Sequence, residues 1–422
     1  MVTIAVIGLG SRGKNYMNVV SHFCKKDAKI VAICDKFKER LLEVQSTFLI
    51  PDDKSFDNEE AFWKAGKLAD AIFICTQDRD HYHHVLKAIE LGYQILCEKP
   101  LSPSIRECQE MADKAKAKGI TMVVCHVLRY SNYYSKVKTL LDSGIIGEVV
   151  SIDHTENIGY FHFAHSYVRG NWRNSNTTTP MIMAKTCHDF DLIHWFMNGG
   201  CERISSFGGL KYFTSANAPE GAGERCLNCS IQKKCPYDAE KFYITDPILK
   251  ATFLRFVGRT LTGKAHAKKE DKYKALREGN YGRCVYHSDN NVADHQMVNM
   301  DFSNGRTASL TVTAFSNKCY RHTHIMGTLG EIRGDDERGI LKVSVFHGKK
   351  EKVSTKFLPI PGHLEGDMNL IKDFIALLNG KPVSQKDISY VDVTVYSHKM
   401  AMAAEHSRLN KGAVVELATY KD

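Results

Sequence analysis

The sequence lacks an apolar run long enough to cross a bilayer. A transmembrane helix needs about 20 apolar residues, and the longest apolar runs of this chain are short, such as Ala71–Cys75. It also lacks a strong charge bias, since 57 Lys and Arg face 48 Asp and Glu, a net charge of +9 over 422 residues. The basic runs Lys268–Lys272 and Lys349–Lys352 are broken by acids, which is typical of solvated surface. These absences argue against a membrane protein and against a nucleic-acid-binding protein.

No internal repeat or low-complexity linker interrupts the chain, and hydrophobic residues make up 43% and charged residues 25% of it. These values indicate a globular protein of two or three domains. No charged leader with a cleavage site precedes the first apolar run, and the 13 cysteines form an odd number. We therefore expect a cytoplasmic protein with reduced thiols, some of which are available as metal ligands.

A glycine motif directly follows the first predicted strand. Thr3–Ile7 is apolar and β-branched, like a strand buried on both faces, and Gly8–Gly13 (GLGSRG) leads into the helical pattern Lys14–Phe23. In this context GxGxxG indicates a dinucleotide site. The first glycine permits the turn, the second lets a pyrophosphate approach the backbone, and the third lets helix and strand pack closely. The helix N-terminus supplies N–H groups for the pyrophosphate.

The next predicted strand ends in an acid. Lys29–Cys34 (KIVAIC) is followed by Asp35, 22 residues after Gly13. A carboxylate in this place binds the 2′- and 3′-hydroxyls of the adenosine ribose and repels a 2′-phosphate. The sequence therefore predicts NAD rather than NADP, a preference that the neighbouring Lys36 weakens.

Strand and helix patterns continue to alternate, which predicts a doubly wound parallel sheet. The further strands are Asp70–Thr76, Tyr93–Cys97 and Thr121–Cys125, and the helices are His83–Leu91 and Ile105–Lys118. A ligand of such a sheet lies at the carboxyl ends of the strands. The candidate binding and catalytic residues of this half follow the ends of the predicted strands: Gly8, Asp35, Thr76, Glu98–Pro100 and His126.

Five further motifs follow in a fixed order. They are a T-x4-H pair (Thr76, His81), an E-K-P segment (Glu98–Pro100), a hinge (Gly144–Glu148), a helix of the pattern H.iDl..wl (Lys185–Trp195) and a late GH.gGD turn (Gly362–Asp367). Together with the glycine motif they resemble the Gfo/Idh/MocA oxidoreductase family. The resemblance covers nearly the whole chain, but it does not fix a substrate.

The resemblance implies an α/β chain with an N-terminal Rossmann domain and a C-terminal α+β domain that carries a large, mostly antiparallel open sheet. We expect residues 1–125 to form the dinucleotide-binding domain and 126–422 the substrate-binding and dimerisation domain, with a Cys-rich insert at about 215–290. The resemblance also implies hydride transfer to or from sugars, inositols or related polyols, in a homo-dimer or homo-tetramer. The predicted NAD-binding residues are Gly8, Gly10, Ser11, Arg12, Gly13, Asp35, Thr76, His81, Glu98 and Lys99.

Period-two patterns in the second half support the antiparallel sheet. Strands are predicted at Met297–Phe302, Thr307–Phe315, Thr323–Thr328 and Leu341–Phe346, and helices at Asp367–Leu378 and Asp392–Leu409. Asn304-Gly305 predicts a hairpin turn between the first two strands. In the family, the open face of this sheet mediates dimers.

Lys99 and His188 are the predicted catalytic pair. The E-K-P lysine is an active-site residue in the family, and its ammonium can polarise a substrate hydroxyl and stabilise a developing alkoxide. His188 can take the hydroxyl proton, because the unperturbed imidazole titrates near neutral pH. It shares a predicted helix face with Lys185 and Asp191. Many family members carry an acid four residues before this histidine, where this chain has Ala184, and Lys185 is the polar substitute.

The stretch Tyr160–Arg173 is unusually rich in aromatic and polar residues. A sugar site needs hydrogen-bonding groups and an aromatic plate, which predicts a substrate wall here. An irregular loop whose aromatics pack between domains remains the alternative. The predicted substrate residues are Tyr160, His165, Arg169, Trp172, Arg129 and Asp191, with Tyr167 as a further acid/base and His165 as its alternative.

Four cysteines of the insert predict a structural zinc site. Cys226-x2-Cys229 and Cys235 are followed by Cys284, and four thiolates close a tetrahedral site. His287 is the alternative fourth ligand. Two alternatives to zinc remain: the cysteines are free buried thiols, or they bind an iron–sulfur cluster. The spacing of the cysteines is irregular for a ferredoxin.

The residues and the family resemblance together imply an NAD-dependent oxidoreductase that moves hydride between nicotinamide and a ring carbon of a sugar, glycoside or cyclitol. One alternative is an NAD-dependent glycosidase that oxidises C3 transiently, eliminates the aglycone, adds water and reduces the ring again. Another is a non-catalytic NAD-binding sensor or scaffold. Accumulation of NADH separates the dehydrogenase from the glycosidase.

Overall fold

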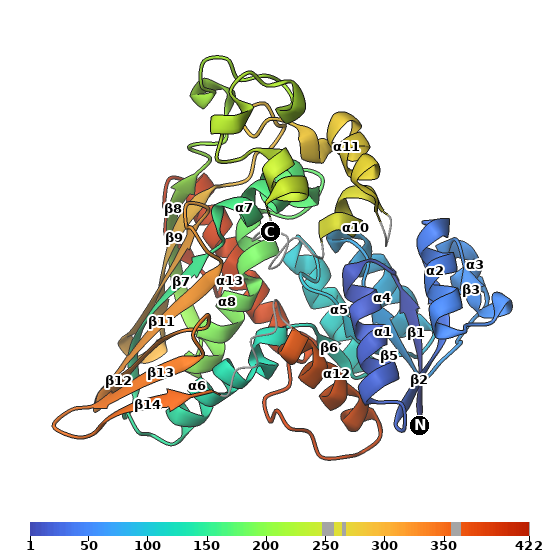
Figure 1. The fold of residues 1–422 in the computed structure, drawn as a ribbon. Helices are drawn as coiled ribbons and strands as arrows, with labels where there is room; N and C mark the ends of the chain where they lie inside the picture. The colour runs from blue at the N-terminus through green and yellow to red at the C-terminus, as the bar shows by residue number, and fades with distance from the viewer. Residues whose placement is uncertain (247–256, 264–266, 356–363, 422) are drawn as a thin grey trace. The chain divides into compact units, whose positions relative to one another are not determined.

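The computed structural model describes residues 1–246, 257–263, 267–355 and 364–421 (Figure 1). The chain divides into two compact units. The first comprises Met1–Lys136, His363–Lys399 and Lys421–Asp422, and the second comprises Val137–Gly362 and Met400–Tyr420. Gly362 and His363 of the predicted GH.gGD turn lie outside the described residues.

The first unit contains a parallel sheet of six strands in the order β3-β2-β1-β4-β5-β6. This is a dinucleotide-binding order, in which the strand order reverses between β1 and β4. The strands are β1 (Val2–Ile7), β2 (Ala28–Cys34), β3 (Ser55–Phe56), β4 (Ala71–Ile74), β5 (Gln94–Cys97) and β6 (Met122–Val124). The helices between them are α1 (Ser11–Phe23), α2 (Lys38–Phe48), α3 (Glu59–Lys64), α4 (His81–Glu90) and α5 (Ile105–Ala117). The predicted doubly wound sheet is confirmed.

The core of this unit is completed by a segment from far along the chain. α12 (Leu364–Leu378) packs against α1, and its residues Leu370, Ile371 and Phe374 are buried among the apolar side chains of β1 and α1. Because apolar side chains fill both faces of the sheet, β4 is buried throughout and β1 is buried except at Thr3.

The second unit contains a sheet of nine strands in the order β14-β13-β12-β11-β7-β10-β9-β8-β15. Its described pairs are antiparallel except β7 with β10, which confirms the predicted mostly antiparallel sheet. The strands are β7 (Val149–Asn157), β8 (Cys201–Gly209), β9 (His295–Phe302), β10 (Arg306–Thr313), β11 (Tyr320–Gly327), β12 (Gly330–Asp335), β13 (Ile340–Val345), β14 (Lys350–Ser354) and β15 (Val415–Glu416).

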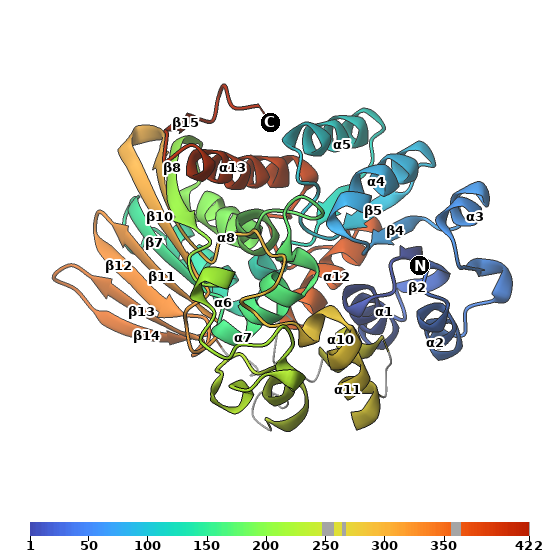
Figure 2. The same ribbon diagram turned by 90° about the horizontal axis from the view of Figure 1, so that it is seen from above.

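The turn between β9 and β10 follows its sequence signal. Asn304 and Gly305 adopt φ of +66° and +71°, the left-handed values that a tight hairpin requires. α8 (Met181–Met197) and the C-terminal part of α13 (Val391–Leu409) lie along one face of this sheet (Figure 2). The opposite face is open in the part of the chain that the structure describes, and Phe207 and Met297 on it are 58% and 55% exposed.

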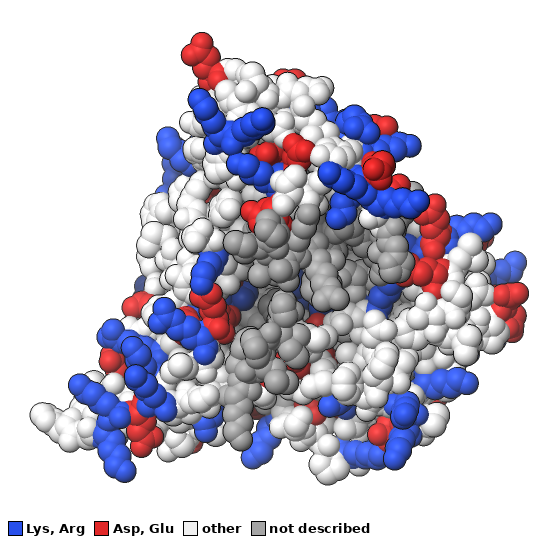
Figure 3. All heavy atoms as spheres, in the orientation of Figure 1, with Lys and Arg blue, Asp and Glu red and all other residues white. Residues whose placement is uncertain are grey.

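The predicted Cys-rich insert follows β8 and consists largely of loops with short helices. Its longer helices are α10 (Val257–Thr262) and α11 (Lys269–Glu278). No described helix combines the length and the apolar character that a membrane span requires. On the face drawn in Figure 3, blue Lys and Arg atoms lie among red Asp and Glu atoms rather than in one large patch.

Candidate active site

The glycine motif forms a turn between β1 and α1 that leaves no room for side chains at its first and third glycines. Gly8 has φ +90°, and a Cβ there would lie 2.5 Å from the carbonyl oxygen of Cys75. A Cβ at Gly13 would lie 2.1 Å from the carbonyl oxygen of Gly8, so α1 packs directly on the turn. At Gly10 no atom lies within 4 Å of the Cβ position, which leaves the backbone accessible to a ligand.

The N-terminus of α1 fits an anion. Ser11 and Arg12 begin the helix, and Gly10 at the N-cap offers no side-chain acceptor to its first N–H groups. Such a helix end attracts negative charge through its dipole and its N–H donors. The turn and the helix therefore fit the pyrophosphate of a dinucleotide.

Asp35 lies at the carboxyl end of β2, beside this turn, and is 7% exposed. Its carboxylate accepts the N–H of Leu9 at 2.6 Å and the N–H of Phe37 at 2.8 Å. Each carboxylate oxygen keeps a second lone pair. A ribose hydroxyl can therefore still donate to Asp35, which fits the adenosine ribose of NAD.

Arg12 joins the glycine turn to two distant segments. Its guanidinium donates to Glu98 Oε1 at 2.7 Å and to both oxygens of Asp367 on α12, at 2.5 and 2.9 Å. Tyr16 also donates to Glu98, at 2.5 Å. Burial alone would raise the pKa of Glu98, but the charge of Arg12 holds it below its usual value. Asp367 was not predicted from the sequence, although its position in the late GH.gGD motif was an available signal.

The Thr76–His81 pair holds the E-K-P segment. His81 is 1% exposed, and its Nδ1 lies 2.8 Å from the carbonyl oxygen of Pro100 while its Nε2 lies 3.2 Å from that of Thr76. The backbone N–H of Lys99 donates to Glu98 at 3.1 Å. The segment that carries Lys99 is thus fixed on both sides.

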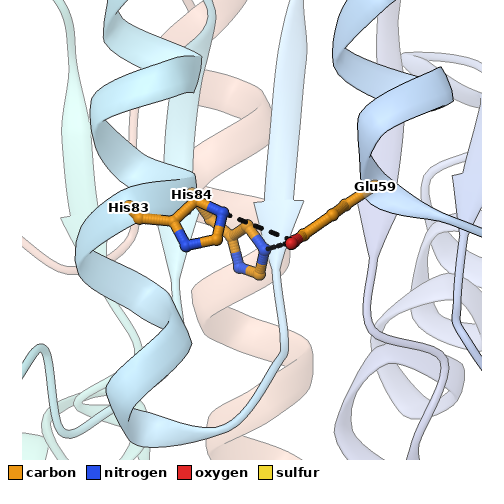
Figure 4. Close-up of side chains that lie close together, drawn as sticks. All are labelled: Glu59, His83 and His84. Carbon is orange, nitrogen blue, oxygen red and sulfur yellow. Dashed lines mark hydrogen bonds and ion pairs between the residues drawn. The ribbon is translucent and has the colours of Figure 1, made fainter.

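A cluster that was not predicted from the sequence lies next to Thr76. Glu59 of α3 and the adjacent His83 and His84 of α4 converge (Figure 4), and Glu59 Oε2 lies 2.6 Å from Nε2 of His84 and 3.4 Å from Nε2 of His83. Partial burial would raise the pKa of Glu59, but the hydrogen bond with His84 lowers it below its usual value. Nδ1 of His84 contacts the Thr76 hydroxyl at 3.0 Å, so this cluster ties α3 and α4 to the end of β4.

We expect Gly10→Ala and Gly13→Ala to separate ligand binding from folding. Gly13→Ala should lower the free energy of unfolding by about 1–3 kcal/mol, because its methyl group collides with backbone. Gly10→Ala should leave that free energy within about 0.5 kcal/mol, because its methyl group meets open space. It should nevertheless weaken NAD binding by about 10-fold or more, equivalent to about 1.4 kcal/mol. Urea titration and calorimetric binding measure the two effects. An unchanged Kd in Gly10→Ala would show that NAD does not approach this backbone.

In the second unit, α8 faces the sheet with two charged residues one turn apart. Lys185 Nζ lies 3.0 Å from Glu156 of β7. The carboxylate of Asp189 accepts a hydrogen bond from Nε of Arg321 on β11 at 2.7 Å. Arg321 also reaches Glu156 at 2.7 Å. Asp189 further accepts Nε2 of His154 at 2.9 Å. Two cations and two carboxylates are thus paired inside the unit, and Asp336 adds a third carboxylate 3.8 Å from Nη1 of Arg321.

The acid of this network is Asp189, which was not predicted from the sequence, and Asp191 stays a predicted substrate residue. Burial would raise the pKa of Asp189, but the charge of Arg321 and the hydrogen bond from His154 hold it well below its usual range. Glu156 and Arg321 were missed because β7 was not predicted as a strand and Arg321 precedes the predicted strand Thr323–Thr328. His188 and Asp191 are 4% and 1% exposed on the same helix.

The predicted substrate wall, Tyr160–Arg173, folds as helical turns in which the aromatic rings pack on one another. Tyr160 lies edge-on to Tyr237, and Tyr167 contacts Phe163 and Trp172. Tyr167 is 4% exposed, whereas Trp172 is partly exposed. Arg129 belongs to the first unit, where it is 2% exposed, so it does not share a unit with the other candidates.

His165 is held by aromatic neighbours. Its Nδ1 lies 2.9 Å from the hydroxyl of Tyr243, and its ring stacks on Tyr281. Burial, with a smaller effect of the Arg169 charge, lowers the pKa of His165 to about 3. An imidazole of that pKa is a weak base, so the structure favours a packing role for His165 over acid/base catalysis.

The depressed pKa of His165 predicts a pH-dependent stability. Between its unfolded pKa of about 6.5 and its folded pKa of about 3, the unfolded state binds the extra proton, so stability falls as pH falls. His165→Gln removes this titration. From pH 7 to pH 4.5 the wild-type free energy of unfolding should therefore drop by about 2 kcal/mol more than that of the variant. His406→Gln, at an exposed histidine of the same unit, is the control for urea titrations at both pH values. Equal pH slopes in wild type and His165→Gln would contradict the assignment.

Arg169 is placed differently from its prediction as a substrate residue. It is 1% exposed, and its guanidinium donates to Cys226 Sγ at 3.3 Å and to the carbonyl oxygens of Arg283 and Tyr237 at 2.8 and 2.7 Å. The physical reason is that acceptors of the Cys-rich insert surround its guanidinium, which is therefore buried there instead of reaching solvent. Arg169 thus belongs to the thiol cavity rather than to a substrate wall.

Two models of known families match the chain. The model described as oxidoreductase family, NAD-binding Rossmann fold, matches residues 2–126, and the model described as oxidoreductase family, C-terminal alpha/beta domain, matches residues 138–391. The chain belongs to the Gfo/Idh/MocA oxidoreductase family. Its glycine turn, Asp35 and the N-terminus of α1 accordingly lie in the NAD-binding domain of this Gfo/Idh/MocA protein.

Individual relatives agree with this assignment. The oxidoreductase YteT of Bacillus subtilis is 24% identical over 324 residues, which is 74% of this chain and 68% of YteT. Inositol 2-dehydrogenase/D-chiro-inositol 3-dehydrogenase of Shouchella clausii is 26% identical over 205 residues, 48% of this chain and 55% of that protein. The solved structure of an oxidoreductase from Agrobacterium radiobacter with NAD+, L-tartaric acid and magnesium superposes with a TM-score of 0.69 over 99% of this chain and 98% of that one, at 17% identity. This last likeness concerns the fold.

Proposed function

We propose that this Gfo/Idh/MocA protein is an NAD-dependent oxidoreductase that moves hydride between nicotinamide and a hydroxyl-bearing ring carbon of a sugar, glycoside or cyclitol. The observation that carries the proposal is the glycine turn, with its accessible Gly10 backbone and Asp35 beside it, in a Rossmann sheet. The relative from Shouchella clausii, an inositol dehydrogenase, supports the cyclitol and sugar class of substrate.

The bound cofactor would supply the hydride acceptor or donor. In the oxidation direction, the ammonium of Lys99 donates a hydrogen bond to the substrate oxygen and stabilises the alkoxide that develops there. His188 accepts the hydroxyl proton. Lys185 is held by Glu156, and Asp189 by Arg321 and His154, so both fix the rotation of α8 and thereby the direction of His188.

Tyr160, Tyr167, Trp172 and Asp191 remain our proposed substrate contacts, with Tyr167 as the further acid/base. Asp35 favours NAD over NADP, because a 2′-phosphate would meet its negative charge. We also propose a cytoplasmic protein and a homo-dimer or homo-tetramer that associates through the open face of the nine-stranded sheet.

A screen of purified protein tests the function. Inositols, sugars and aryl glycosides are incubated with NAD or NADP while the absorbance of reduced nicotinamide and the release of aglycone are followed together. Net NADH with a sugar or an inositol supports the proposal. Aglycone release without net NADH would replace the dehydrogenase with the redox-cycling glycosidase. NAD binding without any turnover across the panel would favour a sensor or scaffold.

A further inference from the structure

Four thiols of the second unit surround one small cavity. Cys226, Cys229, Cys235 and Cys284 all line a space of about 20 Å³, and Arg169 lines it with them. The cavity accommodates about one water-sized sphere. It therefore has room for a single ion but not for an iron–sulfur cube.

The backbone brings the fourth thiol to the other three. Arg225 and Arg283 form an isolated antiparallel bridge, and the N–H of Cys284 donates to the carbonyl oxygen of Glu224 at 2.9 Å. Cys284 is thus adjacent to Cys226, although the chain between them includes α10 and α11. This pairing selects Cys284 over His287 as the fourth ligand, because Cys284 and not His287 lines the cavity.

Backbone N–H groups point at three of the sulfurs. Gly223 donates to Cys229 Sγ at 3.3 Å, Tyr237 donates to Cys235, and Tyr286 and His287 donate to Cys284. A sulfur accepts such bonds weakly as a thiol and better as a thiolate, and metal-bound thiolates are oriented by donors of this kind. These donors form a ready-made outer shell for a metal.

Arg169 supplies the charge argument. It is 1% exposed, its Nη1 has no hydrogen-bond partner, and no described carboxylate lies within 4.0 Å of its nitrogens. A buried guanidinium is costly unless negative charge compensates it. Asp238, which is 3% exposed, lines the same cavity and offers one negative charge. A divalent ion with four thiolates carries a net charge of −2, so it would add negative charge beside this arginine.

We propose that Cys226, Cys229, Cys235 and Cys284 bind one Zn²⁺ as a closed tetrahedral site, with Arg169 as the positioning residue that balances its charge. Among the described residues, Glu59, His83 and His84 form the group of three or more possible metal ligands whose ligand atoms lie within 4.8 Å of one another. The four cysteine sulfurs are therefore farther apart than they would be around a bound zinc ion. Zn–S bonds of about 2.3 Å place sulfurs about 3.8 Å apart. Metal binding therefore draws the four side chains inward around the cavity.

A zinc site here would brace the proposed substrate wall. Arg169 belongs to the same helical turn as Tyr167, and its guanidinium connects that turn to the Cys235 and Cys284 segments through Tyr237 and Arg283. The site is closed by four protein ligands, which leaves no position for substrate. Its role is structural.

The test is the metal content of the full-length protein purified from zinc-supplemented cells under reducing conditions. We expect about one zinc per chain by elemental analysis and about four sulfur neighbours at about 2.3 Å by X-ray absorption. Each of Cys226→Ser, Cys229→Ser, Cys235→Ser and Cys284→Ser should lose the zinc. Cys319→Ser, at an exposed cysteine of the same unit, should retain it.

A second measurement covers serine variants that fail to fold. Titration of wild-type protein with an organomercurial should release the zinc into a chromogenic chelator as about four thiols react. Arg169→Met should speed zinc loss to a chelator by about 10–100-fold, and Arg169→Lys should restore part of the retention. Absence of zinc, iron with acid-labile sulfide, disulfides among the four cysteines, or zinc retained by Cys284→Ser would each overturn the proposal. None of these readouts uses turnover, so they are independent of the proposed oxidoreductase activity.

Discussion

The Lys99→Met variant is expected to lose about 10²–10⁴-fold in kcat, a loss much larger than the accompanying rise in the Kd for NAD. Methionine keeps much of the length of the side chain and removes the ammonium that stabilises the developing alkoxide. The backbone of Lys99 is held through Glu98 and the adjoining Pro100, so the substitution should not disturb the E-K-P segment. The measurement is steady-state kinetics on the substrate that the screen identifies, with calorimetric binding of NAD.

Lys114→Met is the matched control for this variant. Lys114 lies on α5 of the same unit, is 52% exposed and pairs with Glu110 at 2.8 Å. Its replacement should leave both kcat and Kd unchanged. His188→Ala should lower kcat to a similar degree as Lys99→Met, because it removes the proton acceptor. Full activity in either Lys99→Met or His188→Ala would refute the proposed division of the proton chemistry.

Asp189→Asn should lower the free energy of unfolding by about 3–5 kcal/mol. The substitution keeps the shape of the side chain and removes the negative charge that faces Arg321 and His154. The buried Arg321 would then lose one of its two closest carboxylates and keep Glu156 at 2.7 Å and Asp336 at 3.8 Å. The measurement is urea-induced unfolding at neutral pH, monitored by tryptophan fluorescence.

Asp301→Asn is a matched control, since it removes a carboxylate from an arginine pair on the same sheet. Its partner Arg203 is 55% exposed, and such pairs contribute about 0–1 kcal/mol. The pH dependence adds a second check. Because the folded pKa of Asp189 is depressed, its contribution is fully present above the unfolded pKa of about 3.9 and is lost as pH falls through the lower folded pKa. A loss below about 1 kcal/mol at pH 7 would show that the network is solvent-screened.

The Rossmann half could be predicted from sequence because its local signals and its topology coincide. β1, β2, β4 and β5 are short apolar runs that end at turn or polar residues, and the structure places each within two residues of its predicted limits. In the second half the hairpin at Asn304-Gly305 was predicted for the same reason, because two consecutive positive φ values need such residues. Strand β7 was missed, since its run VVSIDHTEN contains polar residues at inward positions.

The part of the site that could be predicted from sequence is the part whose residue types have few other structural uses. Three glycines and an acid at this spacing after a strand serve few purposes besides dinucleotide binding, so Gly8, Gly10, Gly13 and Asp35 could be named. Charged residues in the second unit have many uses. Arg169 was taken for a substrate contact although it points at thiols, and the partners of Asp189 come from strands far away in sequence. Only the three-dimensional pairing of β7 and β11 brings Glu156 and Arg321 together.

The discontinuity of the first unit has a consequence for biosynthesis. The glycine turn and the six parallel strands leave the ribosome early, but the helix that covers Tyr16 and Val20, with Phe374 and Leu370, is translated only after all of Val137–Gly362. At roughly 5–20 residues per second the delay is on the order of ten seconds or more. During that interval the nascent nucleotide-binding half exposes an apolar surface to solvent, so chaperones that shield hydrophobic chains are expected to retain it until α12 arrives.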